Sequence, residues 1–228
     1  MADLVDAAGR AVAVPLAALA RVRQAKPMHP RGVLFDALLQ RRGLACGVDW
    51  LDTTGADDVL VRFSRGAGLP RRLPDLLGFA LRLPGERPVD LLLSSTGQGR
   101  WSRRLPVPRR DAATTYGSIM AYRSTAGPVW LAAVPQGAAL PSDREGLAVA
   151  GPGRVMILSA AVGRGPWERF GSVTLRAVTD PNDPPLHFDA VLHAPPGLAA
   201  DGPLARFRGP AYAAARVAQG ADREVGSR

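Results

Sequence analysis

The chain has 228 residues, which is enough to bury a substantial apolar core, and we expect a single domain. Hydrophobic residues make up 46% of the sequence, which excludes an extended disordered chain. No apolar run reaches the roughly 18 residues that a membrane helix requires, and the first residues lack the basic region of a secretory signal. We therefore expect a soluble, cytoplasmic protein with no membrane partner.

The net charge of +9 comes almost entirely from arginine, with 28 arginines and one lysine. The arginines are spread from Arg10 to Arg228, and aromatic residues, at 6%, do not interleave with them as a stacking platform for bases requires. We therefore expect no nucleic-acid partner. The single cysteine, Cys46, excludes an internal disulfide and a metal cluster built from cysteines.

The first part of the chain predicts one helix followed by strands. Residues 15–24 carry apolar side chains at helical spacing behind Pro15, a residue suited to the first helical position. Residues 33–39 are apolar and fit either a helix or a strand. Short apolar runs bounded by Gly, Pro or Asp then predict strands at residues 59–63, 78–83 and 89–93.

The second part predicts further strands and a closing helix. Residues 98–110 are rich in Arg and Pro, which indicates a crossing over the surface. Strands are predicted at residues 128–134, 154–161 and 172–178, a turn at 180–185, a Gly/Pro-rich arm at 191–203 and a helix at about 211–218. Many short strands with little helix between them favour an α+β fold in which a closed antiparallel β-barrel carries flanking helices.

Five short motifs, in order along the chain, resemble the haem-pocket segments of the catalase superfamily. The motifs are His29-x-x-Gly32, Arg62-Phe63-Ser64, Asp75-x-x-Gly78-Phe79-Ala80-x-Arg82, Asp90-Leu91 and Arg208-x-x-x-Tyr212. They frame about 185 residues between Lys26 and Tyr212, while the middle third matches poorly. The resemblance implies a catalase-like barrel and a haem b cofactor, as in small catalases and catalase-related haem peroxidases.

The resemblance implies that Tyr212 is the haem-iron ligand and that Arg208 stabilises its phenolate. A nearby fixed cation lowers the pKa of a phenol, which a tyrosinate ligand requires at neutral pH. If both residues lie on the closing helix, their spacing of four places them on one face, one turn apart. Pro210 lies between them and interrupts a helical backbone, so Arg208 can instead precede the helix.

On the other side of the haem, the resemblance implies that His29 is the distal acid–base and that Ser64 orients it. An imidazole suits proton transfer between the two oxygens of a peroxide because its pKa lies near neutrality. Arg62 and Lys26 match positions where the family places cations against the haem propionates. Lysine supplies the charge at its position without the bidentate fork of the family's usual arginine.

The clearest departure from the family lies at Ser94-Ser95, where catalases have two asparagines and the second helps to bind peroxide. Ser95 can form a hydrogen bond to peroxide but cannot place an amide there. The substitution therefore favours a peroxidase or isomerase chemistry over catalase turnover. The expected substrate is hydrogen peroxide or an organic hydroperoxide, and the expected state is a monomer or homodimer.

Two other functions fit the sequence. A catalase-like barrel without haem could bind a small apolar ligand or a protein partner. A metal-dependent phosphoesterase is the third alternative, with His187, His193 and Asp189 as its ligand set.

Overall fold

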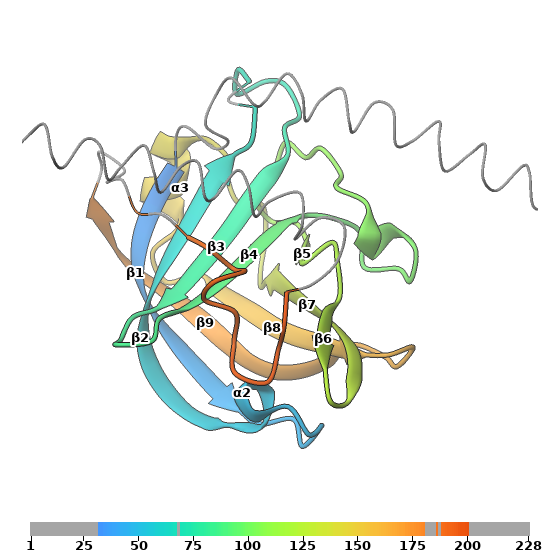
Figure 1. Ribbon diagram of the computed structural model, residues 1–228. Coiled ribbons are helices and arrows are strands. Elements are labelled where there is room, and N and C mark those ends of the chain that lie inside the picture. The colour runs from blue at the N-terminus through green and yellow to red at the C-terminus, as the bar shows by residue number, and fades with distance from the viewer. Residues whose placement is uncertain (1–31, 68, 181–185, 187, 201–228) are drawn as a thin grey trace, which may run out of the picture.

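A computed structural model of the chain describes residues 32–67, 69–180, 186 and 188–200, and these residues form one nine-stranded antiparallel sheet (Figure 1). The strands are β1 (Gly32–Arg42), β2 (Thr54–Arg65), β3 (Leu77–Leu83), β4 (Val89–Ser95), β5 (Tyr116–Gly117), β6 (Tyr122–Ser124), β7 (Gly127–Pro135), β8 (Val155–Val162) and β9 (Glu168–Asp180). Neighbours along the sheet follow the order β5-β4-β3-β2-β1-β9-β8-β7-β6.

The sheet closes on itself because the two residues of β5 pair with two partners. Tyr116 lies opposite Ser95 of β4 on one side and Ala133 of β7 on the other. These pairings complete a ring of β1–β5 and β7–β9, and β6 is added as a short hairpin strand on β7. The closed antiparallel β-barrel expected from the sequence is confirmed.

Helix is scarce in the described part of the chain. It consists of α2 (Asp49–Asp52), α3 (Arg144–Ala150) and the 3-10 turn η2 (Ser102–Arg104). Asp143 begins α3 as its N-cap, with its carboxylate accepting a hydrogen bond from the Gly146 amide. The helices expected at residues 15–24 and 211–218 lie outside the described residues. None of the helices described is long and apolar enough to cross a membrane.

The barrel interior is filled by side chains. Alternate residues of each strand point inward and form one apolar cluster that includes Phe35, Phe63, Phe79 and Tyr116. The ring centroid of Phe63 lies 6.1 Å from that of Phe35, 5.3 Å from that of Phe79 and 5.8 Å from that of Tyr116. A barrel packed in this way leaves its outer surface and its ends as the places where a ligand of appreciable size can bind.

Buried polar residues close one end of the barrel. The Arg65 guanidinium donates to the Ser142 hydroxyl at 2.6 Å and to the Leu73 carbonyl at 2.8 Å. The Asp75 carboxylate, 3.7 Å from Arg65 Nε, accepts hydrogen bonds from three backbone amides, those of Ala67, Leu69 and Leu76. These bonds fix the β2–β3 loop against the other loops at that end.

Beyond β9, residues 188–200 form an arm that runs along the outside of the barrel (Figure 1). The Asp90 amide donates to the His193 carbonyl at 2.8 Å, which attaches the arm to β4. Farther along, the Trp50 amide of α2 donates to the Pro196 carbonyl at 3.3 Å, and Ala199 pairs with Arg123 of β6. The arm is therefore held at three places that are far apart in sequence.

The central position of Phe63 in the core leads to a prediction about stability. Its side chain is 1% exposed, so Phe63→Ala should lower the free energy of unfolding by about 3–5 kcal/mol, as in other large-to-small core substitutions. Chemical denaturation monitored by circular dichroism measures this change. The matched variant Leu105→Ala removes an apolar side chain that is 46% exposed and should change the value by less than about 0.5 kcal/mol. Equal effects of the two substitutions would contradict the packing described.

The hydrogen bonds of Asp52 lead to a second prediction, about how stability depends on pH. Its carboxylate accepts hydrogen bonds from the amides of Cys46, Gly47 and Val48 at 2.7, 2.8 and 3.2 Å. The bond from the Cys46 amide is the main cause of a pKa below the ordinary value of 3.8. A lowered folded-state pKa contributes stability above the unfolded-state value, and this contribution disappears as the pH falls through the folded value.

The Asp52→Asn variant should therefore unfold more easily than wild type at pH 7, and the gap should narrow as both are acidified towards about pH 2. Denaturation midpoints of the two proteins across this range measure the effect. A gap that stays constant with pH would show that the charge of Asp52 contributes nothing to it.

Candidate functional site

The outward side chains of β1–β4 form a regular grid, which we call the outer face. Because successive residues of a strand point to opposite sides, residues between the inward-pointing core positions belong to this face. The strand registers align them in three rows. The rows are Gly32–Ser64–Gly78–Ser94, Leu34–Arg62–Ala80–Leu92 and Asp36–Leu60–Arg82–Asp90.

The first row brings Ser64 beside small residues. Ser64 is 9% exposed, and its register partners are Gly32 on β1 and Gly78 on β3. His29 lies outside the described residues, and two residues of chain separate it from Gly32. Two of the segments joined by the family resemblance, His29-x-x-Gly32 and Arg62-Phe63-Ser64, therefore meet at this row.

Arg62 lies against the beginning of β1. A Cβ atom at Gly32 would stand only 2.7 Å from Cζ of Arg62 and 2.6 Å from the carbonyl oxygen of Phe63. Glycine at position 32 therefore leaves the space through which the Arg62 guanidinium passes. This places a positive charge at the edge of the outer face, next to Ser64. Lys26, the second cation expected there, lies outside the described residues.

Ser95 is on the opposite side of β4 from this face. It continues the inward series of Val89, Leu91 and Leu93, and it is completely buried. Its hydroxyl donates to the Val107 carbonyl at 2.7 Å and accepts from the Leu77 amide at 3.0 Å. Since the single hydroxyl proton is already donated, the described contacts of Ser95 are structural, and its peroxide-binding role stays a prediction.

Sequence reasoning gave no role to Ser94, which belongs to the outer face. Ser94 faces outward and is paired with Gly78, two strands from Ser64. The alternation of side chains within β4 could have identified Ser94, because it lies an even number of residues from Asp90 and Leu92 and so faces the same side of the sheet. The motif resemblance alone selected Ser95 because it counts residues and takes no account of the side of the sheet.

At the other edge of the outer face, the third row ends in a buried charged cluster. Asp90 is 0% exposed, and Arg82 donates to both of its carboxylate oxygens, at 2.7 and 2.6 Å. The Asp189 amide donates to the same carboxylate at 2.7 Å, and Nδ1 of His193 lies 3.0 Å from it. A buried carboxylate that accepts this many hydrogen bonds holds the arm against β4.

The arm also covers part of the outer face with apolar side chains. Phe188 packs with Leu34 and Ala80, and Leu60, Leu92 and Leu186 pack against this group. The Arg82 guanidinium lies 5.1 Å from the centre of the Phe188 ring, in a cation–π contact. The middle of the grid is therefore an apolar surface shared by the barrel and the arm.

The described geometry gives His193 and Asp189 structural contacts. The Asp189 carboxylate accepts hydrogen bonds from the amides of Val191 and Leu192, while His193 faces Asp90. Within the described ranges, no group of three His, Cys, Asp or Glu side chains could hold a metal ion. His187 lies outside these ranges, as do the two residues of the predicted iron site, Arg208 and Tyr212.

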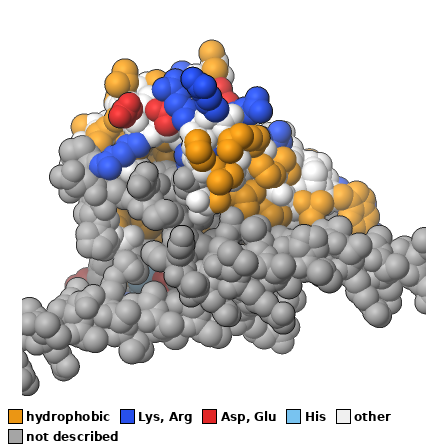
Figure 2. Space-filling view, turned by 90° about the horizontal axis from the view of Figure 1, so that it is seen from above, with side chains coloured by type: hydrophobic (Ala, Val, Ile, Leu, Met, Phe, Trp, Pro, Cys, Tyr) orange, Lys and Arg blue, Asp and Glu red, His pale blue; other side chains and the backbone are white. Residues whose placement is uncertain are grey.

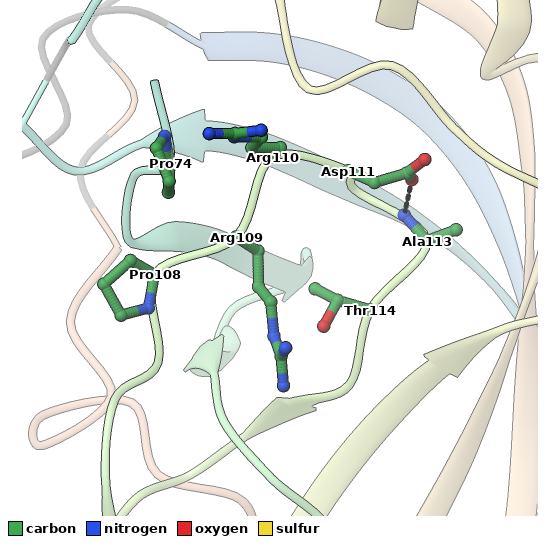
Figure 3. A pocket seen from close by; sticks show the side chains of 7 residues that line it. All are labelled: Pro74, Pro108, Arg109, Arg110, Asp111, Ala113 and Thr114. Atoms are coloured by element: carbon green, nitrogen blue, oxygen red, sulfur yellow. Dashed lines mark hydrogen bonds between the residues drawn. The ribbon is translucent and has the colours of Figure 1, made fainter. Parts of the chain in front are cut away.

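Two open pockets lie away from the outer face. One, of about 450 Å³, is at the barrel end between the β2–β3 and β4–β5 loops and includes Arg109 and Arg110 (Figure 3). The other, of about 320 Å³, lies against β7 and β8 and is bordered by Trp167. Neither pocket contains Ser64, Arg62 or Ser94.

Comparison with known proteins supports the fold. No protein-family model matches the sequence, and no functionally curated protein matches it. The structure is similar to that of a fungal catalase, with a TM-score of 0.58 and 15% sequence identity over 85% of this chain and 60% of that chain. It is also similar to catalase A from Saccharomyces cerevisiae, with a TM-score of 0.61 and 13% identity over 88% of this chain and 63% of that chain.

The chain therefore matches only about 60% of the length of these two catalases. At such low identity the similarity is one of fold, and it confirms the architecture that the sequence motifs implied. The chain has a catalase-like fold.

Proposed function

We propose that this protein binds haem b and acts as a peroxidase or catalase-like enzyme on hydrogen peroxide or an organic hydroperoxide. The observation that carries the proposal is the first row of the outer face. There, the Ser64 side chain lies beside Gly32, the residue that ends the His29 motif, and the Arg62 guanidinium crosses the same point. Two of the predicted residues, Ser64 and Arg62, thus lie with Gly32 at one edge of a catalase-like barrel.

The chemistry of the outer face fits haem. A porphyrin is flat and apolar with two carboxylates at one edge, so it requires a surface of small and apolar side chains next to a cation. The small and apolar residues are Gly78, Ala80 and Leu92, and the cation is Arg62. Ser64 and Ser94 add hydroxyls at the same edge.

In this proposal, each residue has a role that its side chain can perform. Tyr212 ligates the iron as a phenolate, and Arg208 lowers the pKa of that phenol. His29 accepts a proton from one peroxide oxygen and delivers it to the other, while Ser64 fixes the orientation of the imidazole through a hydrogen bond. Arg62 and Lys26 pair with the propionates. Bound haem would supply the redox chemistry that none of these side chains provides.

A second candidate, a barrel without haem that binds a small apolar ligand or a partner, has one observation in its favour. Leu186 and Phe188 pack on the outer face against Leu60, Ala80 and Leu92, so the arm covers part of this apolar surface. If the arm stays in this position, the space for a porphyrin is reduced. Haem binding separates the two candidates.

The proposal predicts that the wild-type chain, expressed with a haem precursor, shows a Soret band and peroxide-dependent oxidation of a phenolic reductant. Tyr212→Phe should lose or strongly shift the band, because it removes the oxygen that ligates iron. Tyr122→Phe makes the same chemical change at a buried tyrosine of β6 and should leave the band unchanged. Visible absorption spectra measure both. A wild-type chain that never acquires the band would refute haem binding, and an unchanged spectrum in Tyr212→Phe would refute the ligand assignment.

The role of Ser64 makes a further prediction. In the haem-loaded protein, Ser64→Ala should lower kcat/KM for the peroxide by about tenfold, as loss of a group that orients a catalytic side chain typically does. The Soret band should persist, because Ser64 has no part in holding the iron. Ser159→Ala on β8 is the matched control, since that serine borders the pocket away from the outer face, and it should change neither quantity. Equal rates for all three proteins would exclude Ser64 from the reaction.

A further inference from the structure

The pocket at the barrel end has features of a separate binding site. It is about 450 Å³ in volume and open to solvent, and it lies where the β2–β3 loop meets the β4–β5 loop (Figure 3). Its walls combine apolar Pro74, Pro108 and Ala113 with polar Arg109, Arg110 and Thr114. None of the residues assigned to haem contributes to it.

The backbone that carries the two arginines is held rigidly. Arg109 exchanges two backbone hydrogen bonds with Asp75, of 2.9 and 2.8 Å. The Arg110 carbonyl accepts from the Ser142 hydroxyl at 2.7 Å, and that hydroxyl accepts in turn from the Arg65 guanidinium at 2.6 Å. Arg65 is 9% exposed and Ser142 is 6% exposed, so this chain of bonds belongs to the barrel's buried closure. The pocket's cations therefore project from a preorganised loop.

The charges of the two arginines are not neutralised within the pocket. Oδ1 of Asp111, the one carboxylate in the wall, accepts hydrogen bonds from the amides of Ala113 and Leu140, at 2.6 and 2.8 Å. Asp75 is likewise engaged by backbone amides and lies beside Arg65. Neither Arg109 nor Arg110 forms an ion pair with a described residue. Figure 2 shows arginine side chains gathered next to hydrophobic ones on the face seen from above.

The two guanidinium groups extend in different directions. In Figure 3, Arg110 extends along the rim towards Pro74, whereas Arg109 extends towards the side of the pocket where Thr114 lies. A single small anion would therefore engage one of them, and a molecule with two separated anionic groups would engage both. The proline and alanine walls between them suit a short apolar spacer.

We propose that this pocket binds a small organic dianion whose two carboxylate or phosphate groups are joined by an apolar spacer. Arg109 and Arg110 each bind one anionic group, and the Thr114 hydroxyl donates a hydrogen bond to the group beside Arg109. The site is independent of haem, so it adds a second ligand to the protein.

Isothermal titration with straight-chain dicarboxylates from succinate to suberate, at constant ionic strength, tests the proposal. Binding should be saturable in the millimolar range, should peak at one chain length and should be at least about fivefold tighter than that of acetate, because two fixed cations select a spacing. Organic bisphosphates with the same spacers identify which anionic group is preferred. Inorganic phosphate should bind more tightly than acetate only to the extent that its larger charge explains.

Arg109→Gln and Arg110→Gln should each weaken binding of the best dicarboxylate by about threefold or more and abolish its preference for one chain length. The matched control is the double variant Arg71→Gln/Arg72→Gln, which removes an adjacent arginine pair of the β2–β3 loop that does not line the pocket. It should leave the affinity and the length preference unchanged. Affinity that does not depend on chain length, an equal loss in the control, or the absence of saturable binding would each overturn the proposal.

Discussion

The alternation of side chains around a closed barrel is the constraint on which the rest of the structure depends. Once Phe63, Phe79 and Tyr116 occupy the interior, the residues between the core positions of each strand must point outward. A shift of β2 by one residue would turn Arg62 inward and Phe63 outward. The packing of the core therefore determines which side chains can form a site on the outer face.

The buried carboxylate of Asp90 fixes the position of the arm that follows the barrel strands. It binds Arg82 from the neighbouring strand and the Asp189 amide from the arm, and it lies beside His193. Removing a partner from a buried charge is costly, so the arm cannot leave β4 without exposing this cluster to water. In the proposed function, the arm leads towards Arg208 and Tyr212, and its attachment would determine where the segment that carries them begins.

The strands were predictable from sequence where apolar runs were long enough to show a pattern. Those at residues 59–63, 78–83 and 89–93 are confirmed as parts of β2, β3 and β4, and residues 33–39, which also fitted a helix, belong to β1. The strands β5 and β6 were missed because two or three residues carry no periodic signal, although β5 closes the barrel. The helix α3 was also missed, despite the N-cap residue Asp143 that begins it.

The candidate site, like the strands, was predicted only in part. The resemblance to catalases brought Ser64 and Arg62 to attention, and the register confirms that both belong to one outward face. It also drew attention to Ser95, whose described contacts are with backbone in the interior, while the outward residue is Ser94. The contact between Asp90 and His193 joins residues 103 positions apart, and nothing local in the sequence indicates such a pairing.

The central claim is that the outer face of β1–β4 is the haem surface, and a crystal structure of the protein produced with a haem precursor tests it most directly. The account predicts porphyrin density over Gly78 and Ala80, with the propionates at Arg62, the Phe188 side chain moved away from Ala80 and the arm still attached to Asp90 of β4. Porphyrin bound elsewhere, or an outer face that stays packed under the arm in a protein saturated with hemin, would contradict it.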